Sequence, residues 1–107
     1  MPFDCLEVSL QLTRSVRTVL ARLGTKDSSL TDQLRRATAS VPLNLSEGRR
    51  RVGKDRLHLW RVAAGSAQEV RATLQVAEAF GYVDGEDVGE ALGLVDRVLA
   101  MTWRMTR

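Results

Sequence analysis

Apolar residues recur at steps of three and four along most of the chain, the spacing that places side chains on one face of an α-helix. The first stripe predicts a helix over roughly residues 4–23, ended by Gly24 in a left-handed cap. Its members are Leu6, Leu12, Val16, Val19, Leu20 and Leu23. A second helix is expected over about 29–49, with Ser29 and Asp32 as the capping pair at its start.

A longer stripe predicts a third helix from Lys54 to Phe80, closed by Gly81, with Tyr82 folding back onto the last turn. Its members are Trp60, Ala63, Ala67, Val70, Leu74 and Ala77. Asp84 is the expected cap of a fourth helix that runs to about Arg104, with carboxylates in its first turn.

Four such helices with short connections predict an all-α fold, an antiparallel up-and-down four-helix bundle, as one domain over residues 1–107. Pro42 lies inside the second helix, where it removes one backbone hydrogen bond and clashes with the carbonyl of Thr38, at about 3 kcal/mol. The second helix is therefore expected to be kinked.

The fourth helix carries more apolar surface than one buried face requires. Its first stripe consists of Val88, Leu92, Val95, Leu99 and Trp103, and a second consists of Leu94, Val98, Met101 and Met105. Together they cover an arc of about 200°, whereas a surface helix needs little more than about 100°. The second stripe predicts an oligomer interface, and the alternative is a helix wedged deeply between two neighbours of the same chain.

Polar residues near the proline share one helix face, since Ser40, Asn44 and Glu47 are spaced by four and three. They form either a small-ligand pocket or a structural hydrogen-bond network, and the absence of a nucleophilic or titrating companion favours the network. In that interpretation Asn44 satisfies groups freed by the proline, and Glu47 pairs with Arg36 or Arg61.

The segment 61–69 is rich in small residues and is expected to pack closely on the second helix. Gly65 is expected there for contact distance. Ser66 and Glu69 are placed in the same network as Ser40.

The composition, 44% hydrophobic and 27% charged over 107 residues, fits a small folded domain. A net charge of +3 hides two poles, because residues 35–61 hold eight basic and two acidic residues and residues 78–96 hold six acidic and no basic residues. No signal peptide, membrane span or possible intrachain disulfide is evident, which predicts a cytoplasmic protein.

A basic cluster marks the turn between the second and third helices, and its members are Arg49, Arg50, Arg51, Lys54 and Arg56. Arginine forks suit bidentate contacts to phosphate, so these five residues are the predicted nucleic-acid contacts. The alternatives are a solvated turn or a docking face for the acidic 78–96 segment of a neighbouring subunit.

Enzymatic motifs are absent from the sequence. A single histidine, His58, and a single cysteine, Cys5, cannot supply a zinc site, and neither a phosphate-binding glycine loop nor a nucleophile elbow occurs. We expect a protein that is not an enzyme and holds no metal and no cofactor.

Several stretches resemble one known family. They are Phe3-Asp4-Cys5-Leu6-Glu7-Val8, the run from Gln33 to Ala37, the run from Ser40 to Gly48, then Arg61, Ala63, Gly65-Ser66 and Glu69, and finally Gly81-Tyr82. The chain is similar in these stretches to the small bacterial four-helix-bundle proteins of intervening sequences in 23S ribosomal RNA genes. Relatives of that family include the accessory variability protein of diversity-generating retroelements.

The resemblance implies a bundle without enzymatic activity that assembles into a ring, typically a pentamer, with basic surfaces. It also implies that nucleic acid and a protein such as a reverse transcriptase are candidate partners. The chain departs from the family pattern in its first loop, which lacks an aromatic-proline pair, and at Leu57, where phenylalanine is usual. The predicted function is homo-oligomeric nucleic-acid binding, and the alternative is an adaptor that docks a partner enzyme through its fourth helix or its acidic segment.

Overall fold

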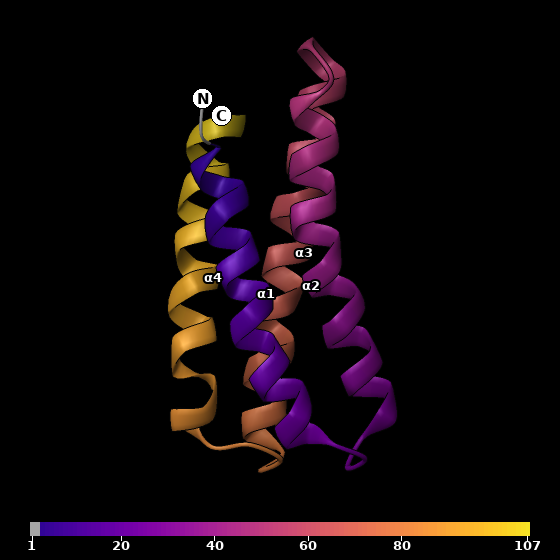
Figure 1. Cartoon of the computed structure of the whole chain (residues 1–107), viewed down its shortest axis with the longest axis vertical. Coiled ribbons are helices and arrows are strands. Elements are labelled where there is room, and N and C mark those ends of the chain that lie inside the picture. The colour runs from indigo at the N-terminus through magenta and orange to yellow at the C-terminus, as the bar shows by residue number, and fades with distance from the viewer. Residues whose placement is uncertain (1–2) are drawn as a thin grey trace.

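The computed structural model describes residues 3–107, which form four helices and no strand. The helices are α1 (Asp4–Leu23), α2 (Ser28–Arg49), α3 (Gly53–Ala79) and α4 (Gly85–Thr106). They lie side by side as a four-helix bundle (Figure 1), so the predicted all-α fold is confirmed. Each predicted helix boundary lies within two residues of the observed one.

Each helix packs against two neighbours, in the cyclic order α1, α2, α3, α4. The rings of Phe3 and Trp60 lie 5.6 Å apart, which places the starts of α1 and α3 together. At the opposite end, Lys26 donates a hydrogen bond to the carbonyl oxygen of Tyr82, across the first and third connections. The α2–α3 turn lies at the former end and extends beyond the ends of α1 and α4 (Figure 1).

The core consists of small and medium aliphatic side chains from all four helices. Its largest fully buried members are Leu12, Leu23, Leu34, Leu45, Leu74, Val16, Val19, Val41, Val70, Val88, Val95 and Val98. Trp60, expected in this core, is only half-buried. Alanines at the inward positions of α3 keep the helices close, and burial of the aliphatic chains supplies the main driving force for folding.

Two of the predicted helix ends are confirmed. Asp84 caps α4 by accepting a hydrogen bond from the N–H of Asp87, whose carboxylate accepts one from the N–H of Asp84. Gly81 has φ of 78°, and the N–H of Tyr82 donates to the carbonyl of Ala77, so the chain folds back over the last turn of α3.

Two other helix ends differ from prediction. Asp27, not Ser29, caps α2, because its carboxylate accepts from the N–H of Leu30 at 3.0 Å. Gly24 has positive φ, 54°, but ψ of −122°, which is outside the left-handed helical region. Its N–H still donates to the carbonyl of Leu20 and so ends α1.

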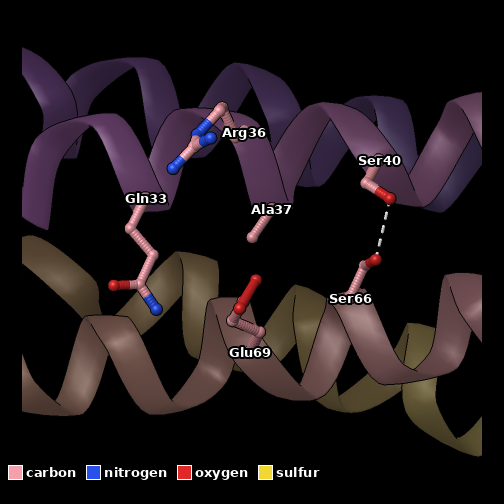
Figure 2. Close-up of a pocket in the computed structure, with 6 residues that line it drawn as sticks. All are labelled: Gln33, Arg36, Ala37, Ser40, Ser66 and Glu69. Atoms are coloured by element: carbon pink, nitrogen blue, oxygen red, sulfur yellow. Dashed lines mark hydrogen bonds between the residues drawn. The ribbon is translucent and has the colours of Figure 1, made fainter.

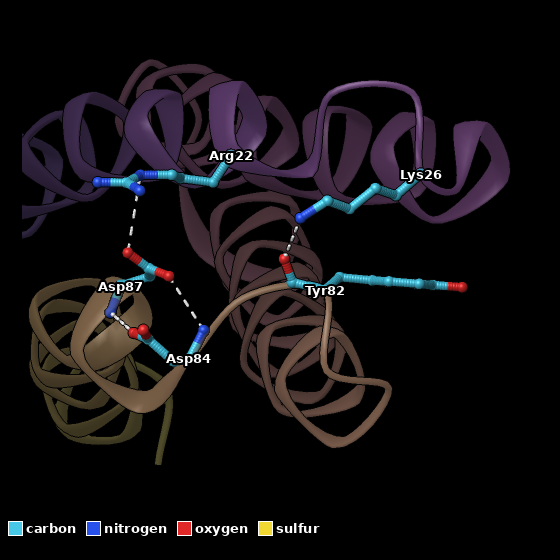
Figure 3. Close-up of polar contacts among 5 residues, drawn as sticks. All are labelled: Arg22, Lys26, Tyr82, Asp84 and Asp87. Carbon is cyan, nitrogen blue, oxygen red and sulfur yellow. Dashed lines mark hydrogen bonds and ion pairs between the residues drawn. The ribbon is translucent and has the colours of Figure 1, made fainter.

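The connections at the α3–α4 end are tied together by polar contacts (Figure 3). Arg22 of α1 lies 3.7 Å from the Asp87 carboxylate, and Lys26 reaches the backbone of Tyr82. The phenol of Tyr82 also donates to Asp27 at 3.3 Å. The start of α4 is therefore held against the end of α1 by charge as well as by packing.

Pro42 lies inside α2, which is continuous from Ser28 to Arg49. The expectation that Asn44 satisfies the carbonyl freed by the proline is wrong, because Asn44 donates to the carbonyl of Ser40 and not to that of Thr38. The kink itself stays a prediction.

The close approach between α2 and α3 occurs at Gly48 and not at Gly65. A Cβ atom on Gly48 would lie 2.6 Å from Cδ1 of Trp60, whereas one on Gly65 would meet nothing within 4 Å. The expectation that Gly65 is required for contact distance is therefore wrong, because Gly65 faces open space.

The buried face of α4 follows the predicted stripe only in part, with Val88 and Val95 fully buried and Leu92 and Leu99 packed against the core. Trp103 is 65% exposed, and Val98, expected at an oligomer interface, is fully buried within the chain. The buried positions are Val88, Ala91, Val95, Val98 and Thr102. Leu94, Met101 and Met105 are half-buried and pack against the core beside this face, so α1 and α3 already cover part of the wide apolar arc.

The Gly48 contact gives a first prediction. We expect Gly48→Ala to lower the free energy of unfolding by about 1–3 kcal/mol, because the new methyl group would force Trp60 away from α2. Urea unfolding followed by circular dichroism measures this change. Gly65→Ala is the matched control and should raise the stability by about 0.4–1 kcal/mol, since alanine is the better helix former. Equal effects of the two substitutions would contradict the assigned contact.

Asp87 gives a second prediction. The hydrogen bond from the Asp84 backbone, and then the nearby Arg22 and Lys26 cations, hold the pKa of the Asp87 carboxyl below its ordinary value of 3.8. Its ionised form is therefore preferred in the folded state, and the stabilisation is present above that value and is lost as the pH falls through the lower, folded pKa. Asp87→Asn should lower the melting temperature at neutral pH, and the difference from wild type should shrink toward about pH 3. A difference from wild type that stays the same down to about pH 3 would contradict the assigned interactions of the Asp87 carboxylate.

Candidate nucleic-acid interface

The α2–α3 turn is short and fully exposed. Arg50 is the C-cap of α2, Gly53 begins α3 with φ of 58°, and Val52 at the tip is 78% exposed. Positive φ favours glycine at this position. The geometry brings the last turn of α2 and the first turn of α3 together, so all five predicted cationic residues lie at one end of the bundle.

The side chain of Arg56 stabilises the α2–α3 turn through hydrogen bonds and a ring contact. Its guanidinium donates to the carbonyl oxygens of Gly48 at 3.2 Å and Arg49 at 2.9 Å, in the last turn of α2, where the carbonyls lack i+4 helical donors. The Gly48 carbonyl also accepts from the N–H of Arg51. The same guanidinium lies 5.3 Å from the ring centroid of Trp60, a cation–π contact. Arg56 therefore caps α2 and is less available to phosphate than predicted.

Two aromatic side chains, Trp60 and Phe3, pack at the base of the α2–α3 turn. The indole N–H of Trp60 donates to the carbonyl of Leu45, and Trp60 also contacts the ring of Phe3. The guanidinium of Arg49 lies 5.2 Å from the Phe3 ring centroid. The α2–α3 turn is thus anchored to the start of α1 through an aromatic pair and two arginines.

Arg51 has a carboxylate partner, Glu47, at 2.9 Å. This pair replaces the expected pairing of Glu47 with Arg36 or Arg61, because the turn after α2 brings Arg51, four residues farther along the chain, back beside Glu47. Both side chains are about half exposed, and a surface pair of this kind contributes little to stability and exchanges readily.

Arg50 and Lys54 remain as cations at the tip. Both are exposed, and within residues 3–107 neither forms an ion pair or a side-chain hydrogen bond. They flank the start of α3, whose first turn has no side-chain cap. The N-terminal end of a helix carries partial positive charge, so the backbone adds to the two side chains.

The acidic segment lies at the opposite end of the bundle, around the α3–α4 connection (Figure 1). Two of its carboxylates are paired, Asp87 with Arg22 and Asp96 with Arg71. The basic turn and the acidic α3–α4 connection therefore lie at opposite ends of the long axis.

The predicted polar network is only partly joined. Ser40 of α2 and Ser66 of α3 share a hydrogen bond of 2.8 Å, and Asn44 donates to the Ser40 hydroxyl at 3.0 Å. Arg36 pairs with Asp32 on its own helix, and Arg61 donates to the carbonyl of Thr106. Of the seven residues predicted to form the network, Ser40, Asn44 and Ser66 are hydrogen-bonded to one another. The other four do not join them, and they are Arg36, Glu47, Arg61 and Glu69.

A shallow groove lies beside the serine pair. It is lined by Gln33, Arg36, Ala37, Ser40, Ser66 and Glu69, and Figure 2 shows the serine pair at one end of the labelled residues. Arg36 lies along α2 and does not reach Glu69 (Figure 2). The arrangement binds the two helices together and presents no nucleophile.

Other potential chemistry is limited in the described part of the chain. Burial raises the pKa of the Cys5 thiol to about 11, against a smaller opposing effect of Arg104, so the thiol is protonated at neutral pH. Residues 3–107 contain no cluster of three His, Cys, Asp or Glu side chains placed to hold a metal ion. None of the helices described is both long enough and apolar enough to cross a membrane.

Residues 3–104 match the sequence model of the family described as 23S rRNA-intervening sequence protein. The chain belongs to that family. The match includes the predicted basic turn and all four helices, and the resemblance seen in the sequence is confirmed for this family.

A solved structure shows the same fold. It is a protein of unknown function from the S23 ribosomal protein family of Bacteroides thetaiotaomicron, similar with a TM-score of 0.89 over 96% of this chain and 98% of that chain. At 15% identity the likeness concerns the fold alone. No curated protein sequence shows significant similarity to the chain.

The contacts of Arg56 give a third prediction. We expect Arg56→Ala to lower the free energy of unfolding by about 1–2 kcal/mol, because it removes two hydrogen bonds to the end of α2 and the contact with Trp60. Arg50→Ala should change it by no more than about 0.5 kcal/mol, since the side chain is exposed at the tip. Chemical denaturation of both variants makes the comparison, and a larger loss for Arg50→Ala would show that the roles are reversed.

Proposed function

We propose that this protein is not an enzyme and is a homo-oligomeric, ring-forming, most simply pentameric protein that binds nucleic acid through its α2–α3 turn. The observation that carries the proposed nucleic-acid contact is the pair Arg50 and Lys54, exposed at the tip of a turn that extends beyond the bundle and without a carboxylate partner among residues 3–107. Arg49 and Arg51 lie beside them, while Arg56 holds the turn in shape.

Phosphate recognition suits this arrangement. Guanidinium and ammonium groups displace counterions from the nucleic-acid backbone, which gives affinity without a requirement for sequence. The uncapped start of α3 adds backbone N–H donors at the same place. Contacts to backbone phosphates need only the exposed cations and carry no sequence information, so the proposed binding is to backbone phosphates.

Oligomerisation would multiply this surface. One turn supplies a few cations, and several turns on one assembly bind one nucleic acid with far higher affinity. The half-buried Leu94, Met101 and Met105 support an assembly, because they leave apolar surface at the edge of the bundle. Arg104 lies with two of them in a groove at the α1–α4 edge.

A fourth prediction tests the nucleic-acid contact. The variant Arg50→Ala/Lys54→Ala should bind labelled duplex RNA and duplex DNA at least about tenfold more weakly at about 50 mM salt. The slope of log affinity against log salt should fall by about 2, because two phosphate contacts are lost. Fluorescence anisotropy over a salt series measures both quantities.

The control for this prediction is Arg36→Ala/Arg97→Ala, which removes the same charge from exposed positions away from the turn. It should retain most of the affinity. Equal losses for the two variants would mean that net charge and not the α2–α3 turn determines binding, and unchanged binding after loss of Arg50 and Lys54 would refute the assignment.

An adaptor function is the second candidate. Two large apolar side chains outside the core favour it, Trp103 on α4 at 65% exposed and Phe80 beside the acidic segment at 66% exposed. A protein partner, such as the reverse transcriptase implied by the resemblance to retroelement proteins, would bury these side chains. A partner retained after nuclease treatment by the wild type and lost with Trp103→Ser or Phe80→Ser would favour this function.

A further inference from the structure

An apolar groove lies on the first turns of α3, beside the exposed cations of the α2–α3 turn. It has a volume of about 370 Å³ and is lined by Gly53, Lys54, Arg56, Leu57 and Trp60. The uncharged part of this lining consists of Gly53 and the half-buried side chains of Leu57 and Trp60. Pockets that hold small ligands begin at about 300 Å³, so the groove has room for one planar ring system.

The groove is open because α1 and α4 do not reach it. Phe3, the residue before α1, contacts Trp60, and Arg61 donates a hydrogen bond to the carbonyl of Thr106 in the last turn of α4. These contacts place the near ends of α1 and α4 at the level of residues 60 and 61 of α3. The α2–α3 turn extends beyond both helices (Figure 1), so in the described part of the chain the groove lies past their ends.

The Trp60 ring is held in place at the inner end of the groove. Its indole N–H donates to the carbonyl of Leu45 at 3.2 Å, and the guanidinium of Arg56 lies 5.3 Å from the ring centroid. An aromatic side chain that is already ordered loses little conformational freedom when a ligand contacts it. The groove is therefore formed before a ligand arrives.

The charge beside the groove is positive. Lys54 and Arg56 belong to its lining, whereas the carboxylates of the turn, Glu47 and Asp55, line a different groove. Among residues 3–107, neither Lys54 nor Arg50 forms an ion pair. A ligand that matches both features combines a flat apolar ring with a negative charge nearby, and a nucleotide of a nucleic acid has both.

A base enters such a groove only if its face is free. In a duplex the bases are stacked and paired, so a protein reaches one only after it is extruded from the helix. In a single strand the bases unstack readily and lie against apolar and aromatic side chains while cations follow the backbone. The apolar groove therefore favours a single strand, although the cations alone favour neither class.

We propose that the α2–α3 turn binds single-stranded nucleic acid, with one base in the groove against Leu57 and Trp60 and the adjoining phosphates on Arg50 and Lys54. The proposal rests on the nucleic-acid binding proposed above and names the class of nucleic acid. Every base has an apolar face, so this contact adds affinity without selecting a sequence. The phosphate contacts depend on salt, whereas the base contact releases no counterions.

Two labelled probes isolate the base contact. One is a single strand of about 16 thymidine nucleotides, and the other is an abasic strand of equal length, which keeps the sugars and phosphates and lacks every base. The wild-type full chain should bind the thymidine strand at least about fivefold more tightly, because only this strand places a base in the groove. Fluorescence anisotropy measures both affinities, and their ratio should persist from about 50 to about 200 mM salt.

A matched pair of variants assigns the difference to the groove. Leu57→Ser removes apolar surface from the lining and should lower the affinity for the thymidine strand to that for the abasic strand. Leu43→Ser makes the same change at a leucine of α2 that is 67% exposed and lies outside the lining, and it should keep the difference. Circular dichroism shows whether both variants remain helical.

Trp60 fluorescence reports the contact with the groove intact. The chain has two tryptophans, so Trp103→Phe leaves Trp60 as the single emitter. At equal saturation the thymidine strand should quench this emission and the abasic strand should not, because only a base lies against the ring. This measurement does not depend on a change to any residue of the groove.

The outcomes separate the base groove from the proposed function. A wild type that binds both strands equally would overturn the groove and leave phosphate binding in place, whereas one that binds neither would overturn both. A difference that survives Leu57→Ser, or that occurs without quenching of Trp60, would place the base elsewhere and overturn the proposal. Arg50→Ala/Lys54→Ala should lose affinity for both strands, and full retention of abasic binding there would contradict the phosphate contacts and not the groove.

Discussion

The close packing of α2 on α3 is the interaction on which the rest of the molecule depends. Gly48 leaves room for the Trp60 ring, and the Trp60 indole donates to the carbonyl of Leu45. Farther along the pair, the hydroxyls of Ser40 and Ser66 meet at 2.8 Å. This contact keeps a long hairpin rigid although its tip extends beyond the other two helices, and a rigid tip holds its cations at fixed positions. α1 and α4 complete the core on the other side of the hairpin.

The cationic residues of the α2–α3 turn fall into two groups, those that stabilise the turn and those that face solvent. Arg56 and Arg49 contact aromatic rings and Arg56 also satisfies helix carbonyls, so part of the positive charge stabilises the turn. Arg50 and Lys54 lie beyond that framework and face solvent. Cations that already bind carbonyls lose part of their capacity for phosphate, whereas exposed cations retain it. The proposed binding surface is therefore narrower than the sequence cluster and better fixed in space.

The basic α2–α3 turn and the acidic α3–α4 connection give the molecule two ends of opposite charge. The acidic segment surrounds the α3–α4 connection, where Asp87 both caps α4 and pairs with Arg22.

The sequence by itself determined the number and bounds of the helices, because a period of 3.6 residues and the chemistry of Asp84 and Gly81 are local properties. It also determined the two charge poles, which need only the order of residues along the chain. Only the tertiary structure decided that Gly48 and not Gly65 is the close contact, that Val98 is buried while Trp103 is exposed, and that Glu47 pairs with Arg51. The tertiary structure also decided that Arg56 caps α2 whereas Arg50 faces solvent. Each of these outcomes depends on how a helix is rotated about its axis in the bundle and on contacts between side chains of different helices. The spacing of residues along one helix does not determine either of these two properties.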